Sequence, residues 1–418
     1  MQKGGVWAFY MKKASEQSRR IYFDNAATTK VEPRVLEAMM PYFKEKFGNA
    51  SSIYSWGEEA RRAVEKARER VAKFLEASPE EIFFTSGATE SINWSHKGVV
   101  ESSKLKVKSE KLPHIITSSI EHKAVLETCK HLEKMGMAEV SYLPVDEGGR
   151  VKVDDVEKAI RSETVLVSIM YVNNEVGTVE PIEDIGRLIA KVRKERERRG
   201  KKWPIFFHTD ATQAIQYFDC NVEKLGADLL SLTGHKFYAP KGIGVLYIKR
   251  GTLMLRQQDG GGQELGMRAG TENVAYIAGL GKAIELITNS RQLKIKKIEN
   301  LRMKLEDGVL KEITGIKLLG QSKGKAPHIA AFVVLGVEGE SLVLALSDEG
   351  IAASTGSACT SSSLSASHVL LAMGVGEEEA HGSLRISLGK DNTEEEVDYF
   401  LEVFSKVVAR LRKMAPKY

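Results

Sequence analysis

Short apolar runs alternate with longer amphipathic stretches between about residues 30 and 250. The amphipathic stretches 57–75 and 124–135 repeat apolar residues at helical spacing. The apolar runs are rich in β-branched and aromatic residues and lie at 82–85, 114–117, 165–169, 205–207, 229–232 and 241–248. Strands that alternate with helices predict an α/β fold with a mostly parallel sheet and helices on both faces.

The chain is long enough for two domains. Its 418 residues exceed the range of roughly 250–300 at which one hydrophobic core stops growing. A helix is predicted at 273–290, followed by a charged helix that runs to Val309. The segment 316–418 then has a strand and helix pattern of its own, so we expect it to form most of a second domain.

The composition is that of a soluble globular protein, with 42% hydrophobic and 28% charged residues. No apolar run reaches the roughly 18 residues of a membrane span, and the polar, basic residues 1–20 lack a signal-peptide pattern. We therefore expect a cytoplasmic protein with an N-terminal extension and no membrane partner. A net charge of +5 does not require nucleic acid. The basic stretch 187–202 is interpreted as a solvated helix end, with a docking site for an acidic protein or a tRNA as the alternative.

Polar side chains follow several of the predicted strands. Ser86, His122, Asn174, Asp210 and Thr233 each come just after an apolar run. Ligands of such sheets bind at the carboxyl ends of the strands. The positions therefore predict one shared site.

Lys236 follows a Thr-Gly-His turn, and Asp210 ends an upstream strand. A lysine of this kind can carry pyridoxal phosphate (PLP) as a Schiff base, while a carboxylate holds the protonated pyridine nitrogen. An isolated Gly-His-Lys sequence is more often an ordinary surface loop. The aspartate and the anion-binding residues nearby favour the PLP site.

The residues expected near the phosphate are small or carry short donors. The run 85–90 follows a strand and opens a helix predicted at 91–100, and the positive end of a helix dipole favours an anion. The whole predicted set is Gly87, Ala88, Thr89, Thr233, His235 and Thr271.

The residues expected near the cofactor ring are Gln213, Asn174 and His122. Gln213 is placed to donate to the ring phenolate, and Asn174 to do likewise or to touch the substrate. His122 would stack on the ring and move protons. A lone histidine at this point would more often simply start a helix, so its role depends on the rest of the set.

Arg385 lies in the run 383–388, which alternates in polarity like a strand. A guanidinium binds a carboxylate through two parallel hydrogen bonds, which suits an amino-acid substrate. The alternative is a surface arginine in an ion pair.

The three cysteines do not form a disulfide framework or a closed metal site. Cys129 lies on an apolar helical stripe and is interpreted as core. Cys220 precedes a helix start and has no assigned role. Cys359 lies among small residues at 353–364, which predicts a mobile loop and makes its thiol a candidate nucleophile.

The motifs together resemble those of cysteine desulfurases of the NifS/IscS-like group, in the class V branch of fold-type I PLP enzymes. The resemblance covers about residues 21–413. The matching runs are 22–29, 85–90, 121–125, 172–177, 208–213, 234–236, 260–264 and 357–360. One departure is Leu265, where relatives commonly have arginine, and the segment 191–202 is longer and more basic than usual.

The resemblance implies a large PLP-binding domain at 35–285 with a seven-stranded type of sheet. It implies a smaller α+β domain made of 21–34 and 286–418, after an extension at 1–20. Thr271 would reach the phosphate of a partner subunit, which implies a homodimer.

The resemblance also implies roles for the candidate residues. Lys236 carries PLP and Cys359 accepts sulfur as a persulfide, with His122 as the acid/base. Arg385, Asn25 and Asn174 bind the carboxylate of L-cysteine. The implied cofactor contacts are Gly87, Ala88, Thr89, Asn174, Asp210, Gln213, Thr233 and His235.

The implied reaction produces L-alanine and delivers sulfur to iron–sulfur cluster assembly. The resemblance also indicates tRNA thiolation as a second destination of the sulfur. The expected partner is an iron–sulfur scaffold protein or another sulfur acceptor. No resident metal is expected, although Cys359 could ligate a cluster transiently with a scaffold. Two alternatives are an aminotransferase or lyase, which needs no Cys359, and a non-catalytic sulfur-transfer subunit, which would have lost the lysine. The presence of both Lys236 and Cys359 argues against each.

Overall fold

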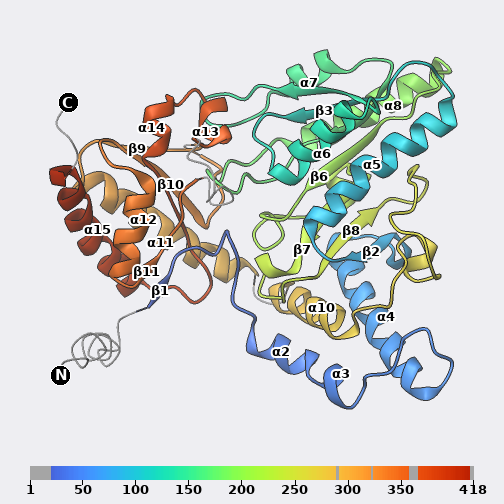
Figure 1. Ribbon diagram of the computed structural model, residues 1–418, viewed down its shortest axis with the longest axis horizontal. Coiled ribbons are helices and arrows are strands. Elements are labelled where there is room, and N and C mark those ends of the chain that lie inside the picture. The colour runs from blue at the N-terminus through green and yellow to red at the C-terminus, as the bar shows by residue number, and fades with distance from the viewer. Residues whose placement is uncertain (1–19, 289–290, 322, 357–365, 415–418) are drawn as a thin grey trace, which may run out of the picture.

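The computed structural model describes residues 20–288, 291–321, 323–356 and 366–414. The candidate nucleophile Cys359 lies outside these residues. Figure 1 shows a layered body built around a large sheet, with the C-terminal elements gathered at one side of it.

A seven-stranded sheet forms the centre of this body. Its strands, in spatial order, are β2 (Ile82–Thr85), β8 (Gly244–Ile248), β7 (Leu229–Thr233), β6 (Phe206–Asp210), β5 (Thr164–Ser168), β3 (His114–Ser118) and β4 (Glu139–Leu143). Strand β8 is antiparallel to both of its neighbours, β2 and β7, and the other adjacent strands of the sheet pair in parallel. The predicted α/β class with a mostly parallel sheet is confirmed. The edge strand β4 was not predicted, because most of its residues are partly or fully exposed and carry no continuous apolar signal.

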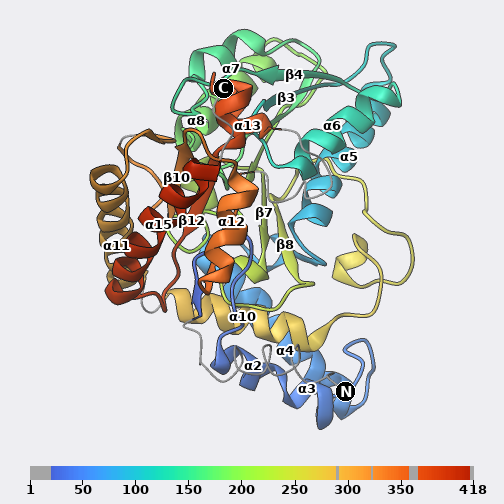
Figure 2. The same cartoon turned by 60° about the vertical axis from the view of Figure 1, so that its left-hand side comes forward.

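Helices cover both faces of the sheet, as the alternation of strands and helices predicts. Helices α4 (Ser55–Leu75), α8 (Ile182–Arg198) and α10 (Val274–Thr288) belong to the core on one face. Helices α5 (Ala88–Val107) and α6 (Lys123–Lys134) belong to the core on the other. Successive strand residues therefore enter different cores, and Figures 1 and 2 show the two helical layers.

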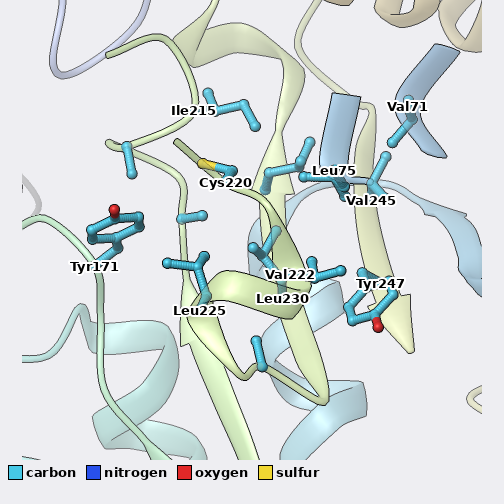
Figure 3. Close-up of a cluster of buried hydrophobic side chains, with 14 of the residues drawn as sticks. Val71, Leu75, Tyr171, Ile215, Cys220, Val222, Leu225, Leu230, Val245 and Tyr247 are labelled. Atoms are coloured by element: carbon cyan, nitrogen blue, oxygen red, sulfur yellow. The ribbon is translucent and has the colours of Figure 1, made fainter. Parts of the chain in front are cut away.

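Figure 3 shows part of the first core, where Val71 and Leu75 of α4 pack near Val245 and Tyr247 of β8. Cys220 lies in the same cluster and is 1% exposed. Cys129 is fully buried in the core of the other face, so the interpretation of Cys129 as core is confirmed.

The C-terminal part adds two small sheets. Strands β12 (Ser383–Ser387), β10 (Ile329–Val334) and β9 (Ile316–Leu318) form an antiparallel sheet, and β1 (Ile21–Tyr22) pairs in parallel with β11 (Ile351–Ala352). The long helices of this C-terminal part are α11 (Arg291–Glu312), α12 (Gly339–Asp348) and α15 (Glu394–Met414).

A separate core of apolar side chains, which includes Phe23, Phe332 and Phe400, fills this region. The domain division at 34/35 and 285/286 stays a prediction, and the separate core is compatible with it.

The remaining elements are short and connect the main layers. They are α2 (Pro33–Met39), α3 (Pro41–Lys44), α7 (Val153–Ala159), α9 (Val222–Leu225), α13 (His368–Ala372), α14 (Glu377–His381), η1 (Pro79–Glu81), η2 (Gly234–Lys236) and η3 (Glu264–Gly266).

The basic stretch at the end of α8 is partly structural. Arg196 is 8% exposed and donates to the carbonyls of Thr164 and Trp203, among others. Arg193 forms an ion pair with Asp228. The expectation of a solvated helix end therefore fails for these two cations, because they tie α8 to the sheet. Across the part of the chain that the structure describes, no helix has both the length and the apolar character to cross a membrane.

Candidate functional site

A cavity of about 650 Å³ opens at the carboxyl ends of the parallel strands. Its wall includes eleven of the predicted site residues: Gly87, Ala88, Thr89, His122, Asn174, Asp210, Gln213, Thr233, His235, Lys236 and Arg385. The five positions that the strand-end argument grouped, Ser86, His122, Asn174, Asp210 and Thr233, all line this cavity. Asn25 and Thr271 are absent from the wall of this cavity, and Cys359 lies outside the described residues.

Lys236 ends the short η2 turn that follows β7. Its Nζ donates to the carbonyl oxygens of Ala26 at 2.5 Å and Ala27 at 2.7 Å. A side chain added at Gly234 would lie 2.9 Å from Ile243 and 3.0 Å from Ala239, so glycine lets the turn pack closely against the strand. The turn thus directs the lysine toward the N-terminal segment that carries Ala26 and Ala27.

Asp210 is the last residue of β6 and is 6% exposed. Its Oδ1 accepts a hydrogen bond from the backbone N–H of Thr212 at 2.9 Å. The Oγ1 atom of Thr212 is buried and has no hydrogen-bond partner among the described residues, although Thr212 lines the cavity. This part of the wall therefore offers a carboxylate and an unused hydroxyl group to a ligand.

His122 caps the N-terminus of α6. Its Nδ1 accepts a hydrogen bond from the N–H of Ala124 at 3.1 Å, so the proton of the neutral ring sits on Nε2. Burial lowers the pKa of His122; the nearby Asp210 carboxylate opposes this shift and Lys236 adds to it. The side chain is therefore a neutral imidazole of fixed tautomer at the cavity wall.

The start of α5 and the η2 turn bring donors suited to an anion to the cavity wall. Helix α5 begins after Gly87, and no side chain caps it. His235 donates or accepts through Nδ1 to the Oγ1 of Thr28 at 3.2 Å. Burial lowers the pKa of His235 to about 4, and the neighbouring Lys236 and Lys241 act in the same direction.

Arg385 lies on β12 and is 3% exposed, although the alternation of its strand also fits a surface position. Its Nη1 donates to the carbonyl of Asn174 at 2.9 Å, and its Nη2 to Asp24 at 2.8 Å. Its Nε is buried without a partner among the described residues. Arg385 does form an ion pair, with Asp24, but the predicted alternative of a surface arginine is wrong, because Arg385 is buried and the Asp24 side chain is only 18% exposed.

Asn25 and Thr271 lie elsewhere. The Asn25 Nδ2 donates to the carbonyl of Ser387 at 3.0 Å and so joins the N-terminal segment to β12. Thr271 is exposed, just before α10. Their predicted ligand contacts stay predictions.

The cavity also has polar neighbours that the motifs did not indicate. Glu175 accepts from the Ser367 hydroxyl at 2.5 Å. His368 lines the cavity, and its Nε2 lies 3.0 Å from the carbonyl of Glu121. Glu175 lies in the matching run 172–177, next to Asn174, which could have indicated it. The contacts of His368 come from distant segments, so no local signal could have indicated that residue.

Three buried carboxyl groups form no ion pair with the described residues. Burial raises the pKa of Glu121 to about 8, of Glu175 to about 7 and of Glu180 to about 8. A carboxyl group whose pKa is raised in the folded protein contributes its full stabilisation below its pKa in the unfolded chain, near 4.5. This stabilisation is lost as the pH rises through the pKa of the folded state.

Buried histidines have the opposite effect. Burial lowers the pKa of a group of them to about 4 or about 3: His96, His114, His235 and His328. A neutral buried imidazole loses stability as the pH falls below its unfolded pKa of 6.5.

The free energy of unfolding is therefore expected to peak near pH 6.5. Each carboxyl lowers it above that pH with a slope of at most about 1.4 kcal/mol per pH unit. Urea unfolding between pH 5 and pH 9 measures the profile. Glu180→Gln removes one titration and should make the alkaline decline shallower, because an amide still accepts from the Val151 N–H. An alkaline decline of unchanged slope in this variant would contradict the assignment.

Comparison with known proteins agrees with the fold and the cavity. The family described as "Aminotransferase class-V" matches residues 21–400. "Cysteine desulfurase IscS" of Clostridium botulinum is 49% identical over 401 residues, which cover 96% of this chain and 97% of that protein. The solved structure "NIFS-LIKE PROTEIN" matches with a TM-score of 0.85 and 42% identity, covering 94% of this chain and all of the other. A structure described as "SspA in complex with cysteine" matches with a TM-score of 0.74 and 38% identity, covering 89% of this chain and all of the other.

The chain therefore belongs to the class-V aminotransferase family and, within it, to the PLP-dependent cysteine desulfurases. Both the predicted family and the predicted cofactor are confirmed.

Proposed function

We propose that the chain converts L-cysteine to L-alanine and transfers the sulfur atom to Cys359 as a persulfide. The observation that carries the proposal is one cavity lined by Lys236, Asp210 and the buried Arg385. The relative whose structure contains cysteine supports the choice of substrate. Delivery of sulfur to an iron–sulfur scaffold protein, and to tRNA thiolation, is part of the proposal.

The donors around the cavity fit PLP. A phosphate suits the uncapped start of α5, and a pyridinium nitrogen suits the carboxylate of Asp210. Lys236 would hold the cofactor covalently, and Gln213 and Thr233 would add hydrogen bonds. When bound, PLP supplies an electron sink for bonds at the substrate α-carbon.

Arg385 would orient the substrate through its carboxylate. Its guanidinium is fixed by Asp24 and the carbonyl of Asn174, while Nε retains an unused hydrogen. A preorganised donor that needs no rearrangement binds a carboxylate at low entropic cost.

Arg385→Lys should weaken L-cysteine binding by about 1.5–3 kcal/mol, because lysine cannot form two parallel hydrogen bonds. The measurement is the dependence of alanine formation on L-cysteine concentration. The affinity for PLP serves as the control and should hold. An unchanged apparent affinity for L-cysteine would refute the role.

The sulfur transfer balances without a further reactant. The carbon–sulfur bond of L-cysteine breaks, a sulfur–sulfur bond to Cys359 forms, and the carbon fragment takes up a proton to become alanine. The thiol proton that Cys359 loses on becoming a thiolate balances the proton that the carbon fragment gains. His122 lines the cavity and is the proposed carrier of this proton, which requires its Nδ1 to release the N–H of Ala124 and take up a proton. The chain leaves the cavity wall near Gly356 and returns to it at Ala366, on either side of the segment that contains Cys359.

We propose that the active unit is a homodimer. Large apolar side chains are exposed on α2, on α3, on the loop that joins α3 to α4 and at the start of α4, which is unusual for a free surface. They are Leu36, Met40, Phe43, Phe47, Ile53, Tyr54 and Trp56. Phe43 also packs edge-to-face on Tyr276 of α10, and Tyr276 lies beside Gly242 of the cavity wall. A second copy on this surface would thus lie close to the cavity.

Light scattering should find twice the mass of one chain. Phe47→Glu places a charge among these exposed apolar residues and should shift the protein toward monomer. Leu344→Glu, at an equally exposed position on α12, is the matched control and should stay dimeric. A wild-type monomer with full PLP occupancy would overturn the homodimer.

The reaction itself is tested by measuring sulfide and alanine from L-cysteine in the presence of a thiol reductant, with and without pyruvate. A desulfurase makes both products without pyruvate. An aminotransferase would require pyruvate and would release no sulfide, so the two activities are distinguishable. Sulfide together with pyruvate and ammonia, in place of alanine, would indicate a lyase.

A further inference from the structure

His328 lies behind the cavity wall, against the residue that is placed to hold the cofactor ring. It precedes β10 and is 2% exposed. Its Nε2 lies 3.3 Å from the Oε1 of Gln213. The other end of the same amide, Nε2 of Gln213, donates to the carbonyl of Ala26 at 2.9 Å. Gln213 is therefore held at both ends by distant segments of the chain.

We propose that His328 is a positioning residue that fixes the side-chain amide of Gln213, so that its remaining N–H points to the ring oxygen of PLP. The proposal rests on the proposed function, because it assumes that PLP occupies the cavity. It adds a residue that the motifs around the lysine did not indicate.

The hydrogen-bond chemistry selects one orientation of the amide. The Ala26 carbonyl only accepts, so it requires the amide nitrogen on its side. The amide oxygen then faces His328, which must donate through Nε2. An amide turned by 180° would place two acceptors together at Ala26 and two donors together at His328. With one N–H on Ala26, Gln213 has a single N–H left for a ligand.

The charge state of His328 agrees with this role. Burial lowers its pKa to about 3, and the cations Arg385, Arg302 and Lys236, from three different elements, act in the same direction. The ring is therefore neutral and carries one hydrogen. Its Nδ1 is buried with no partner among the described residues, so the hydrogen is best used at Nε2.

The histidine is also held in place. Its ring stacks on Tyr217, with centroids 4.1 Å apart and planes 18° apart. Its carbonyl accepts from the N–H of Leu388, just beyond β12. Arg385, which is predicted to bind the substrate carboxylate, lies on β12. The contact with Leu388 therefore links Gln213, through His328, to the same sheet.

The link matters most once Lys236 has bound the cofactor. In the structure, both Lys236 Nζ and Gln213 Nε2 donate to the Ala26 carbonyl. If Lys236 held PLP covalently, its nitrogen would no longer be available as an ammonium donor to this carbonyl. Gln213 then stays as its side-chain donor, and its orientation depends on His328 at the other end.

The experiment compares His328→Leu, which removes the donor, with His328→Gln, whose amide nitrogen can occupy the place of Nε2. The readouts are the affinity for added PLP and the pH titration of the visible absorbance of the holoenzyme. His328→Leu should weaken PLP binding roughly fivefold, the effect of one typical hydrogen bond, and shift the titration midpoint. His328→Gln should restore both values. His114→Leu removes a buried histidine at the far end of β3 and serves as the matched control that leaves the titration in place.

A double-mutant cycle with Gln213→Ala tests whether His328 acts through the amide. In that background His328→Leu should have no further effect on the titration. A full effect there, or an unmoved titration in a folded His328→Leu protein of lower stability, would overturn the proposal. If His328→Leu does not fold, His328→Asn is used instead. The asparagine amide nitrogen would lie near the place of Nδ1 and not of Nε2, so this variant also removes the donor to Gln213. A wild-type protein that binds no PLP would instead overturn the proposed function.

Discussion

Lys236→Ala is expected to abolish the covalent attachment of PLP and to lower turnover of L-cysteine by on the order of 10³-fold or more. The η2 turn places its amino group beside the carbonyls of Ala26 and Ala27 at the cavity wall. Without the amino group, PLP can only bind through its phosphate and ring contacts. The visible absorbance of the lysine-linked cofactor should be absent from the purified variant.

Borohydride reduction of the wild-type holoenzyme, followed by peptide mapping, identifies the linked residue directly. Two other lysines line the same cavity, Lys123 and Lys241, so the assignment is not trivial. Lys241→Ala is the matched control and should keep the covalently bound cofactor. A label on Lys123 or Lys241 in the wild-type protein would refute the role of Lys236.

The main sheet could be predicted because its strands are buried on both faces. The buried pattern of β3, β5, β6 and β7 appears in the sequence as continuous apolar runs. The residues that end these strands then had to meet at one edge, which explains why Asp210 could be placed at the cavity. The edge strand β4 had no such signal, since a half-exposed strand tolerates polar residues.

The site was less predictable where contacts join distant segments. Arg385 is buried because Asp24, 361 residues away in sequence, compensates its charge. His328 meets Gln213 only after the strand β10 packs beside the loop that follows β6. A periodicity argument reports which face a residue occupies, but it does not report the partner on the opposite segment.

Cys359→Ser is expected to stop the formation of sulfide and alanine while leaving PLP binding intact. The serine hydroxyl is not a useful acceptor of sulfur, and only a thiolate is nucleophilic enough for the attack. The residues placed to hold PLP, among them Lys236 and Asp210, lie on other segments of the cavity wall. Turnover should fall by on the order of 10³-fold, whereas the visible absorbance of the bound cofactor should match that of the wild-type protein.

Mass spectrometry of wild-type protein after treatment with L-cysteine should find the added sulfur on Cys359. The other two thiols are internal controls, because Cys129 is fully buried and Cys220 is 1% exposed. Burial also raises the pKa of Cys129, which removes its thiolate at neutral pH. Sulfur found on Cys129 or Cys220 would exclude Cys359 as the acceptor. A Cys359→Ser protein that turns over L-cysteine at the wild-type rate would exclude the persulfide route itself. The chain would then use the lysine and arginine of its cavity for an aminotransferase or lyase reaction, in which no protein thiol takes part.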